Sequence, residues 1–219
     1  MSDVCVVGDA FHKLSNKKNI FTVSDFIQGG VIDDGCDFVF GQGLTLLDIK
    51  RLGKIEKFNT ELSKINPVRC HDTHQHNSRN VLISNFRLAD SLESCSDVFI
   101  FGDNDLLRDH ITGIHIPGIV LSESARQLFI TTLMSAGYDN YRFILNDIVS
   151  EYISYVFPLP FTLSLVFEYE KNLKNEKIIS AHIIASQNMT ECARFNIRAT
   201  LIPEKIATLN EVFSFKKMN

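Results

Sequence analysis

The most continuous apolar segment of the chain predicts one long helix over residues 119–136. The segment has no internal glycine or proline, and its apolar residues fall on several sides of a helical wheel. A helix that is apolar on several sides is typical of a buried position. Gly137 follows directly and is expected to end the helix as a C-cap.

Strand-like segments lie on both sides of this helix. Apolar and polar residues alternate over 161–169 and 193–201, and a period of two indicates an antiparallel sheet with one buried face. The complete set of expected strands is 81–84, 98–101, 142–148, 161–169, 178–186 and 193–201.

The order of these elements predicts a fold. Two strands, one buried helix and four strands follow the order of a hotdog fold, an α+β architecture in which a curved antiparallel sheet wraps around one long helix. Pro203 is expected to open a terminal helix over 203–212.

Residues 1–66 predict a small N-terminal α/β unit, and residues 67–219 the hotdog domain. Asn66-Pro67 marks the boundary, because proline disfavours helix in the residue before it. The expected elements of the small unit are strands over 4–7 and 38–40, a short helix over 21–27 capped near Thr22 or Ser24, and a helix over 44–58.

A Gly41-Gln42-Gly43 turn follows the second of these strands. It lacks the Lys-Ser/Thr of a P-loop and the third glycine of a dinucleotide fingerprint. We therefore interpret it as a plain turn.

Composition narrows the class of protein. The chain has 219 residues and a net charge of −4, so it has no basic field to hold a nucleic acid. The N-terminus lacks the pattern of a signal peptide, and no apolar run approaches the roughly 18 residues needed to cross a membrane. Five cysteines are odd in number and form no C-x-x-C pair, which favours reduced thiols in the cytoplasm. They are Cys5, Cys36, Cys70, Cys95 and Cys192.

The stretch from Asp109 to Gln127 carries the candidate chemistry. His110 and His115 lie in a loop before Pro117-Gly118, where the long helix starts. Backbone N–H groups at a helix start have no intrahelical partner and suit a developing oxyanion. The alternative is that Pro-Gly only makes the turn.

Glu123 lies in the apolar helix, and a buried carboxylate is rare unless it is paired with another polar group or has a functional role. We expect it to act as a general acid or base, with His110 or His115 assisting. The alternative is a structural acid, and Arg126 is expected to be a poor partner because it points elsewhere on the helical wheel. If Glu123 is functional, we expect Arg126 and Gln127 either to bind the phosphate of an acceptor substrate or to orient Glu123.

His71, His74 and His76, with Asp72, have the spacing of a possible metal cluster. A short histidine-rich segment of this kind more often forms a polar loop than a metal site. We therefore expect no metal ion, and no other cofactor.

Two motifs resemble a known family. The run from Pro117 to Gln127, P-G-I-V-L-S-E-S-A-R-Q, resembles the P-G-V-L-x-x-E…Q motif of hotdog 3-hydroxyacyl-ACP dehydratases, and His110 with Gly113 resembles their H-x-x-G. The fuller D-H-x-x-G-x-H-x-P-G…E-S-A-R-Q pattern resembles the AfsA-type hotdog proteins of γ-butyrolactone signal biosynthesis. So does the H-x-H-x-x-x-N-V-L-I-S run over 74–84. The histidine lies one residue closer to Pro-Gly than in the dehydratases.

The AfsA-type resemblance implies an acyl chain delivered as a thioester on ACP or CoA. It implies acyl transfer of the γ-butyrolactone-precursor type, and a homodimer, because AfsA-type chains usually carry two hotdog repeats. The alternatives are a dehydratase or thioesterase, and a non-catalytic acyl-ligand-binding partner. A carrier protein or pathway enzyme would dock on the N-terminal unit. The implied site residues are Glu123, His110 and His115 for catalysis, and Gly118, Asn80, Arg126, Gln127 and His76 for substrate.

Overall fold

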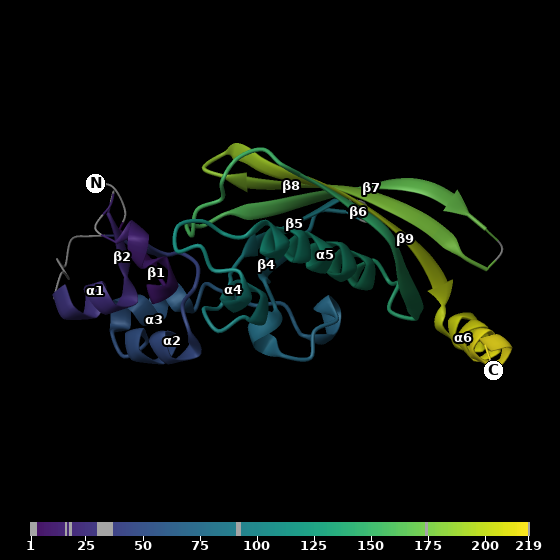
Figure 1. Ribbon diagram of the computed structural model, residues 1–219, viewed down its shortest axis with the longest axis horizontal. Coiled ribbons are helices and arrows are strands. Elements are labelled where there is room, and N and C mark those ends of the chain that lie inside the picture. The colour runs from purple at the N-terminus through teal and green to yellow at the C-terminus, as the bar shows by residue number, and fades with distance from the viewer. Residues whose placement is uncertain are drawn as a thin grey trace.

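A computed structural model of the protein describes residues 4–15, 17, 19–29, 37–90, 93–173 and 175–218. A six-stranded antiparallel sheet, in the order β4-β5-β7-β8-β9-β6, curves over the long helix α5 (Gly118–Ser135) (Figure 1). This arrangement confirms the predicted hotdog fold. The strands are β4 (Ile83–Leu88), β5 (Glu93–Val98), β6 (Tyr141–Tyr152), β7 (Thr162–Asn172), β8 (Lys177–Gln187) and β9 (Thr190–Pro203).

The alternating strands and the helix share one core. Leu163 and Leu165 of β7 and Phe195 and Ile197 of β9 point inward and pack in the same cluster as the buried face of α5. Gly137 ends α5 in the left-handed conformation, with φ at +87°. The helix thus ends where the sequence predicted, because a glycine adopts this conformation without a steric cost.

The N-terminal residues form a three-stranded parallel sheet in the order β2-β1-β3, drawn in purple and blue in Figure 1. Its elements are β1 (Val4–Val7), the 3-10 helix η1 (Asp9–Leu14), β2 (Ile20–Thr22), α1 (Val23–Gly29), β3 (Phe38–Phe40), α2 (Leu46–Leu52) and α3 (Glu56–Leu62). Val7 and Phe11 of this unit lie in the same apolar core as α5. The domain boundary at residue 66 stays a prediction.

Several elements differ from the expectation. The helix predicted over 21–27 begins only at Val23, because residues 20–22 form strand β2. The helix predicted over 44–58 is broken, because α2 ends at a C-cap on Gly53 and α3 starts after Ile55. The strand predicted over 98–101 instead covers 93–98. Two of its three buried positions are the serines Ser94 and Ser96, which an apolar pattern does not reveal.

The Gly41-Gln42-Gly43 turn joins the two sheets through the backbone. The amide of Gly43 donates to the carbonyl of Ile100 (2.8 Å), and that of Gly102 donates to the carbonyl of Leu44 (2.9 Å). A Cβ on Gly8 would lie 1.6 Å from the Gly43 carbonyl oxygen, and one on Gly102 would lie 2.2 Å from it. We call the contact of residues 8 and 41–44 with residues 100–102 the joint.

Three short elements and one terminal helix complete the described chain. The short elements are η2 (His71–Thr73), η3 (Ser78–Asn80) and α4 (Asp105–Asp109). The terminal helix α6 (Glu204–Met218) lies at the far end of the sheet from the N-terminal unit (Figure 1). Among the described residues, no helix combines the length and the apolar character that a membrane crossing needs. The four described cysteines are free thiols, and Cys36 lies outside the described residues.

Candidate functional site

One stripe of α5 is less buried than the rest of the helix. Ile119, Ser122, Glu123 and Arg126 are partly or fully exposed, whereas most other positions of the helix are buried. Their spacing of three or four residues places them along one side of the helix. Ionisable side chains reach solvent from α5 only along this stripe, because Glu123 and Arg126 are the only charged residues of the helix.

Glu123 is held by four hydrogen bonds from three residues. Arg126 donates from Nε to Oε2 and from a terminal nitrogen to Oε1, both at 2.7 Å. Oε1 also accepts from Nε2 of Gln75 (2.8 Å) and from Nε2 of Gln127 (3.0 Å). The carboxylate is therefore fixed in place, and Oε2 carries fewer donors than Oε1. We call Glu123, Arg126, Gln127 and Gln75 the Glu123 network.

The expectation that Arg126 would be a poor partner for Glu123 is wrong. Residues three apart on an α-helix differ by about 60° around the axis and are neighbours on the helix surface. Arg126 therefore reaches Glu123 with both sides of its planar guanidinium, in the two-pronged geometry that suits a carboxylate. Both side chains are mainly buried, at 23% and 18% exposed.

Gln127 connects Glu123 to the strand entry before β4. Its Oε1 accepts from the amide of Leu82 (2.8 Å), and its Nε2 donates to the carbonyl of Asn80 (2.8 Å). The side chain is completely buried. Gln127 thus orients Glu123 from inside the protein, and its predicted contact with substrate stays a prediction.

Gln75 is the member of the network that the sequence did not indicate. It lies 48 residues before Glu123, on the loop after η2. A single glutamine in a histidine-rich loop carries no pattern, so only the folded chain shows that it reaches the helix.

The loop around His74 covers the stripe from one side. His74 adopts a left-handed backbone (φ 53°), and its ring stacks on Phe143 of β6 at 5.4 Å between centroids. Burial, and then the positive charge of Arg126, lower the pKa of His74. The Asp72 carbonyl accepts from Thr131 of α5 (3.0 Å), which ties the loop to the helix.

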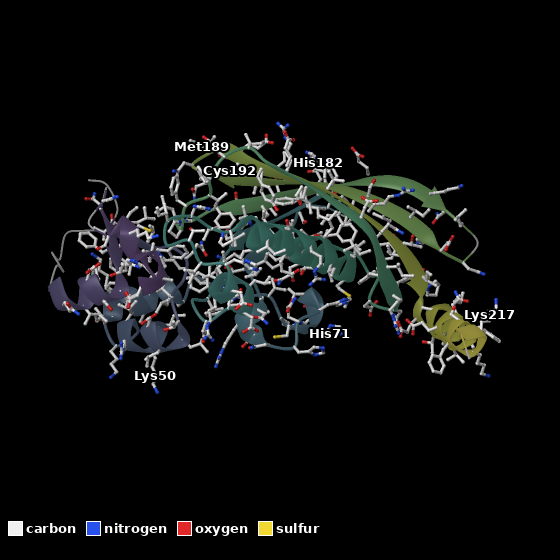
Figure 2. All side chains as sticks on the ribbon, in the orientation of Figure 1. Lys50, His71, His182, Met189, Cys192 and Lys217 are labelled. Carbon is white, nitrogen blue, oxygen red and sulfur yellow. The ribbon has the colours of Figure 1, made fainter. Side chains whose placement is uncertain are left out.

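The three histidines of this loop do not converge. His71 pairs with Asp72 at 3.2 Å and His76 is exposed. No group of three or more His, Cys, Asp or Glu among the described residues has the geometry to hold a metal ion. Figure 2 shows His71 on the opposite side of α5 from His182, which lies on the sheet.

The start of α5 is lined by hydroxyl groups from β6. The hydroxyl of Tyr152 donates to the carbonyl of Gly118 (3.0 Å) and lies 2.7 Å from Oγ of Ser122. A Cβ on Gly118 would approach the Tyr152 ring to 2.8 Å, so the Tyr152 side chain would have to shift to admit any other residue here. Among the described residues, no acceptor bonds to the amides of Gly118 or Ile119.

The two candidate histidines lie apart from Glu123. His110 is exposed at the C-cap of α4, and His115 packs its ring on Tyr155 at 4.8 Å between centroids. Thr112 fixes the backbone of His115, since its Oγ1 accepts from the His115 amide (3.1 Å). In the described part of the chain, neither histidine bonds to Glu123, and their catalytic role stays a prediction.

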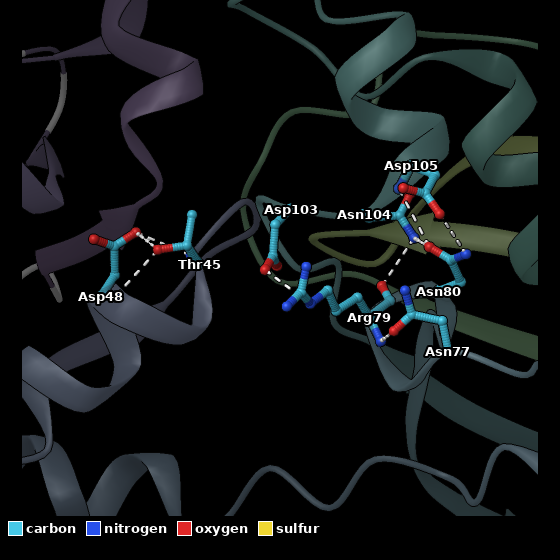
Figure 3. A network of polar contacts seen from close by, with 8 residues as sticks. All are labelled: Thr45, Asp48, Asn77, Arg79, Asn80, Asp103, Asn104 and Asp105. Atoms are coloured by element: carbon cyan, nitrogen blue, oxygen red, sulfur yellow. Dashed lines mark hydrogen bonds and ion pairs between the residues drawn. The ribbon is translucent and has the colours of Figure 1, made fainter.

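Asn80 belongs to a separate polar network that holds the start of α4 (Figure 3). Its Nδ2 donates to Asp105 (2.8 Å), and its Oδ1 accepts from the Asp105 amide (3.2 Å). Arg79 pairs with Asp103 at 3.2 Å, and Asn104 caps α4 by accepting from the Leu107 amide. Asn80 therefore reaches the Glu123 network through its backbone carbonyl, which accepts from Gln127.

Comparisons with known proteins find solved structures of similar fold but assign the chain to no family. No protein-family model matches the chain, and no curated protein matches it. Similar solved structures include a mutant thioesterase from Pseudomonas aeruginosa, with 10% identity, 55% of this chain and 81% of that chain covered, and a TM-score of 0.42. A thioesterase from Haemophilus influenzae has 14% identity, coverage of 62% and 86%, and a TM-score of 0.41. The PaaI protein of the E. coli phenylacetic acid degradation operon has 12% identity, coverage of 52% and 79%, and a TM-score of 0.40. At these identities and TM-scores the likeness assigns no activity to this chain.

Proposed function

We propose that the protein hydrolyses an acyl thioester at the exposed stripe of α5, with Glu123 as the general base. The observation that carries the proposal is the two-pronged bond from Arg126 to Glu123. The guanidinium holds both oxygens of the carboxylate in one orientation. Oε2 accepts one hydrogen bond, from Arg126, so this oxygen has room to accept a proton from water.

Hydrolysis also needs hydrogen-bond donors for the thioester carbonyl oxygen, and the start of α5 supplies them in this proposal. The free amides of Gly118 and Ile119 point out of a helix N-terminus, which carries partial positive charge. A thioester carbonyl oxygen placed there gains hydrogen bonds as negative charge develops on it. Tyr152 and Ser122 form one wall of this entrance.

The proposed reaction consumes one water molecule. Glu123 takes a proton from water, whose oxygen forms a bond to the thioester carbonyl carbon and pushes the electron pair onto the carbonyl oxygen at the helix start. The pair returns, the carbon–sulfur bond breaks, and the thiolate receives the proton from Glu123. The products are a carboxylic acid and a thiol. Gln75 and Gln127 act as positioning residues, because they hold the carboxylate without touching the reacting atoms.

The proposal includes a homodimer, in which a second copy of the chain packs against the first. β6 is the edge strand of the six-stranded sheet, and apolar residues are exposed along it. Ile144, Leu145 and Val149 are 45%, 45% and 59% exposed. Unpaired edges of this kind pair with another strand or are shielded. Light scattering under assay conditions measures the assembly, and a monomer that is fully active would remove this part of the proposal.

Acyl transfer is the second candidate, and the AfsA-type sequence resemblance supports it. Transfer uses the same carboxylate and the same helix start, with an acceptor hydroxyl in place of water. Its discriminating test is a panel of acyl-CoA and acyl-ACP thioesters assayed with and without dihydroxyacetone phosphate. Loss of thioester without acceptor supports hydrolysis. Loss that requires the acceptor overturns hydrolysis in favour of transfer, and tight binding without turnover supports an acyl-ligand-binding protein.

Replacing Glu123 tests the proposed base directly. Glu123→Gln keeps the shape of the side chain but removes the base, so kcat on the best thioester should fall about 100-fold or more. The matched control is Glu191→Gln, which removes another glutamate paired with an arginine three residues later, on the surface of β9. That variant should keep its activity. A Glu123→Gln protein with full turnover would sink the proposed role.

A further inference from the structure

A cavity lies beside the joint, and no member of the Glu123 network lines it. Its volume is about 470 Å³. Its walls come from both units of the chain and include Phe40, Ile65, Ser84, Asp97, Phe99 and Ser186. We call this cavity the joint pocket. Pockets of this size between two structural units are common positions for small ligands.

The sheet separates the joint pocket from α5. Ser94 of β5 faces the helix and lies 2.7 Å from the Thr132 hydroxyl, and Ser96 is buried on the same face. Asp97 follows Ser96, and successive side chains of a strand point to opposite faces. Asp97 therefore lines the pocket from the outer face of the sheet, where Figure 2 shows Met189 on the turn between β8 and β9.

The base of the pocket is fixed before any ligand arrives. Gln42, which also lines the pocket, is buried at 1% exposure. Its Nε2 donates to the Val98 carbonyl (3.0 Å), and its Oε1 accepts from the Ile100 amide (2.7 Å). The joint thus holds the end of β5 in one position, and a ligand would not need to order these residues on binding.

The lining selects against negative charge. Of the described residues that line the pocket, Asp97 alone is charged, and its oxygens accept from Asn85 (2.8 Å) and Arg87 (3.0 Å). The side chains of Ser84, Thr162 and Ser186 add hydroxyl groups, and Phe40 and Phe99 add flat apolar surface. The walls therefore combine aromatic rings with uncharged hydrogen-bonding groups, and they offer no free cation to an anion.

We propose that the joint pocket binds a small uncharged molecule that has one aromatic ring and one hydroxyl group. The ring would pack against the phenylalanines, and the hydroxyl would bond to Asp97 or to the serine and threonine hydroxyls. Acids and phosphorylated compounds would find no partner in the pocket, because the Arg87 guanidinium is already bonded to Asp97 and no cation among the described residues lines the walls. The site is therefore distinct in chemistry from one that takes an acyl-CoA, and its occupant touches the joint and the sheet at once.

Titration of the full chain with benzyl alcohol tests the proposal, with benzoate as the charged counterpart of similar size. Two-dimensional amide NMR spectra should show saturable shifts for the side-chain amides of Asn85 and Asn188, which line the pocket. Benzoate should leave these amides unmoved at the same concentrations. Equal shifts with benzoate, or no saturable shift with benzyl alcohol, would overturn the proposal.

Filling the pocket provides the second arm of the test. Ser186→Phe places a ring in the pocket and should abolish the shifts. Ser180→Phe is the matched control, because Ser180 lies on the same strand and the same face, outside the pocket, and it should bind as the wild type does. Thr162→Phe fills the pocket from another strand and repeats the test if Ser186→Phe fails to fold. Retained binding in a folded pocket-filling variant contradicts the proposal.

Discussion

The joint and the Glu123 network hold the molecule together in different ways. The joint consists mainly of backbone contacts, with the amides of Gly43 and Gly102 bonded to carbonyls across it. The side chain of Gln42 adds two hydrogen bonds to the backbone of Val98 and Ile100. The Glu123 network is made of side chains, with Arg126 and Gln75 bonded to one carboxylate. A backbone contact at this distance has no room for a side chain, whereas a side-chain network tolerates replacements of similar shape. The difference predicts that changes at the joint act on folding, and that changes at Glu123 act first on chemistry.

The largest effect should come from adding one carbon at the joint. In Gly8→Ala the new Cβ would lie 1.6 Å from the Gly43 carbonyl oxygen, which belongs to a backbone held from both sides. The free energy of unfolding should fall by at least about 3 kcal/mol, because overpacking against backbone has no easy relief. Urea denaturation followed by circular dichroism measures this loss.

Gly137→Ala is the control for the joint. It has the same added atom, but nothing lies within 4 Å of its Cβ position, and only the left-handed φ of +87° opposes it. It should cost about 1 to 2 kcal/mol. Gly8 has a φ of −64°, which alanine also adopts, so its backbone conformation does not oppose the substitution. Equal losses for the two alanine variants would show that a small backbone shift relieves the close approach at Gly8.

A smaller effect should come from the buried end of the Glu123 network. Gln127→Leu keeps the volume but leaves the amide of Leu82 without its acceptor in a completely buried position. The free energy of unfolding should fall by about 2 kcal/mol. Gln75→Leu removes a donor to the same oxygen of Glu123 from a half-buried position, so it should lose less stability. A larger loss for Gln75→Leu in urea denaturation would contradict this ranking.

Local patterns in the sequence were sufficient for the parts of the fold that depend on neighbouring residues. The start and end of α5, the alternation along β7 and β9, and the hotdog order all follow from spacings of a few residues. The placement of Glu123 and Gln127 on the helix follows from the same spacings. The Arg126 pair was equally predictable, since it is an i, i+3 neighbour, and the expectation failed there through a misjudged angle.

Contacts between segments that are distant along the chain have no comparable pattern in the sequence. Gln75 meets Glu123 across 48 residues, and nothing in the loop around Gln75 indicates a helix partner. β5 buries Ser94 and Ser96, whose hydroxyls look like surface residues until the helix is placed against them. The glycine turn at residues 41–43 was expected to be a plain turn, and the reason for its glycines lies outside the turn. A Cβ on Gly41 would lie 2.1 Å from the Pro158 carbonyl oxygen, and one on Gly43 would lie 2.6 Å from the Phe11 ring.

The smallest effect should be a pH dependence from His74, at the edge of the Glu123 network. The folded chain lowers the pKa of His74 below 6.5 through burial and the charge of Arg126. The unfolded chain therefore binds a proton more readily, so His74's contribution to stability is complete above pH 6.5 and is lost as the pH falls through the lower folded pKa. His74→Asn keeps a residue that tolerates the left-handed backbone but removes the titrating ring. Between pH 7 and pH 5 its free energy of unfolding should therefore fall less steeply than that of the wild type. If the free energy of unfolding of the two proteins changed equally with pH in urea denaturation, protonation of His74 would not contribute to the pH dependence of stability.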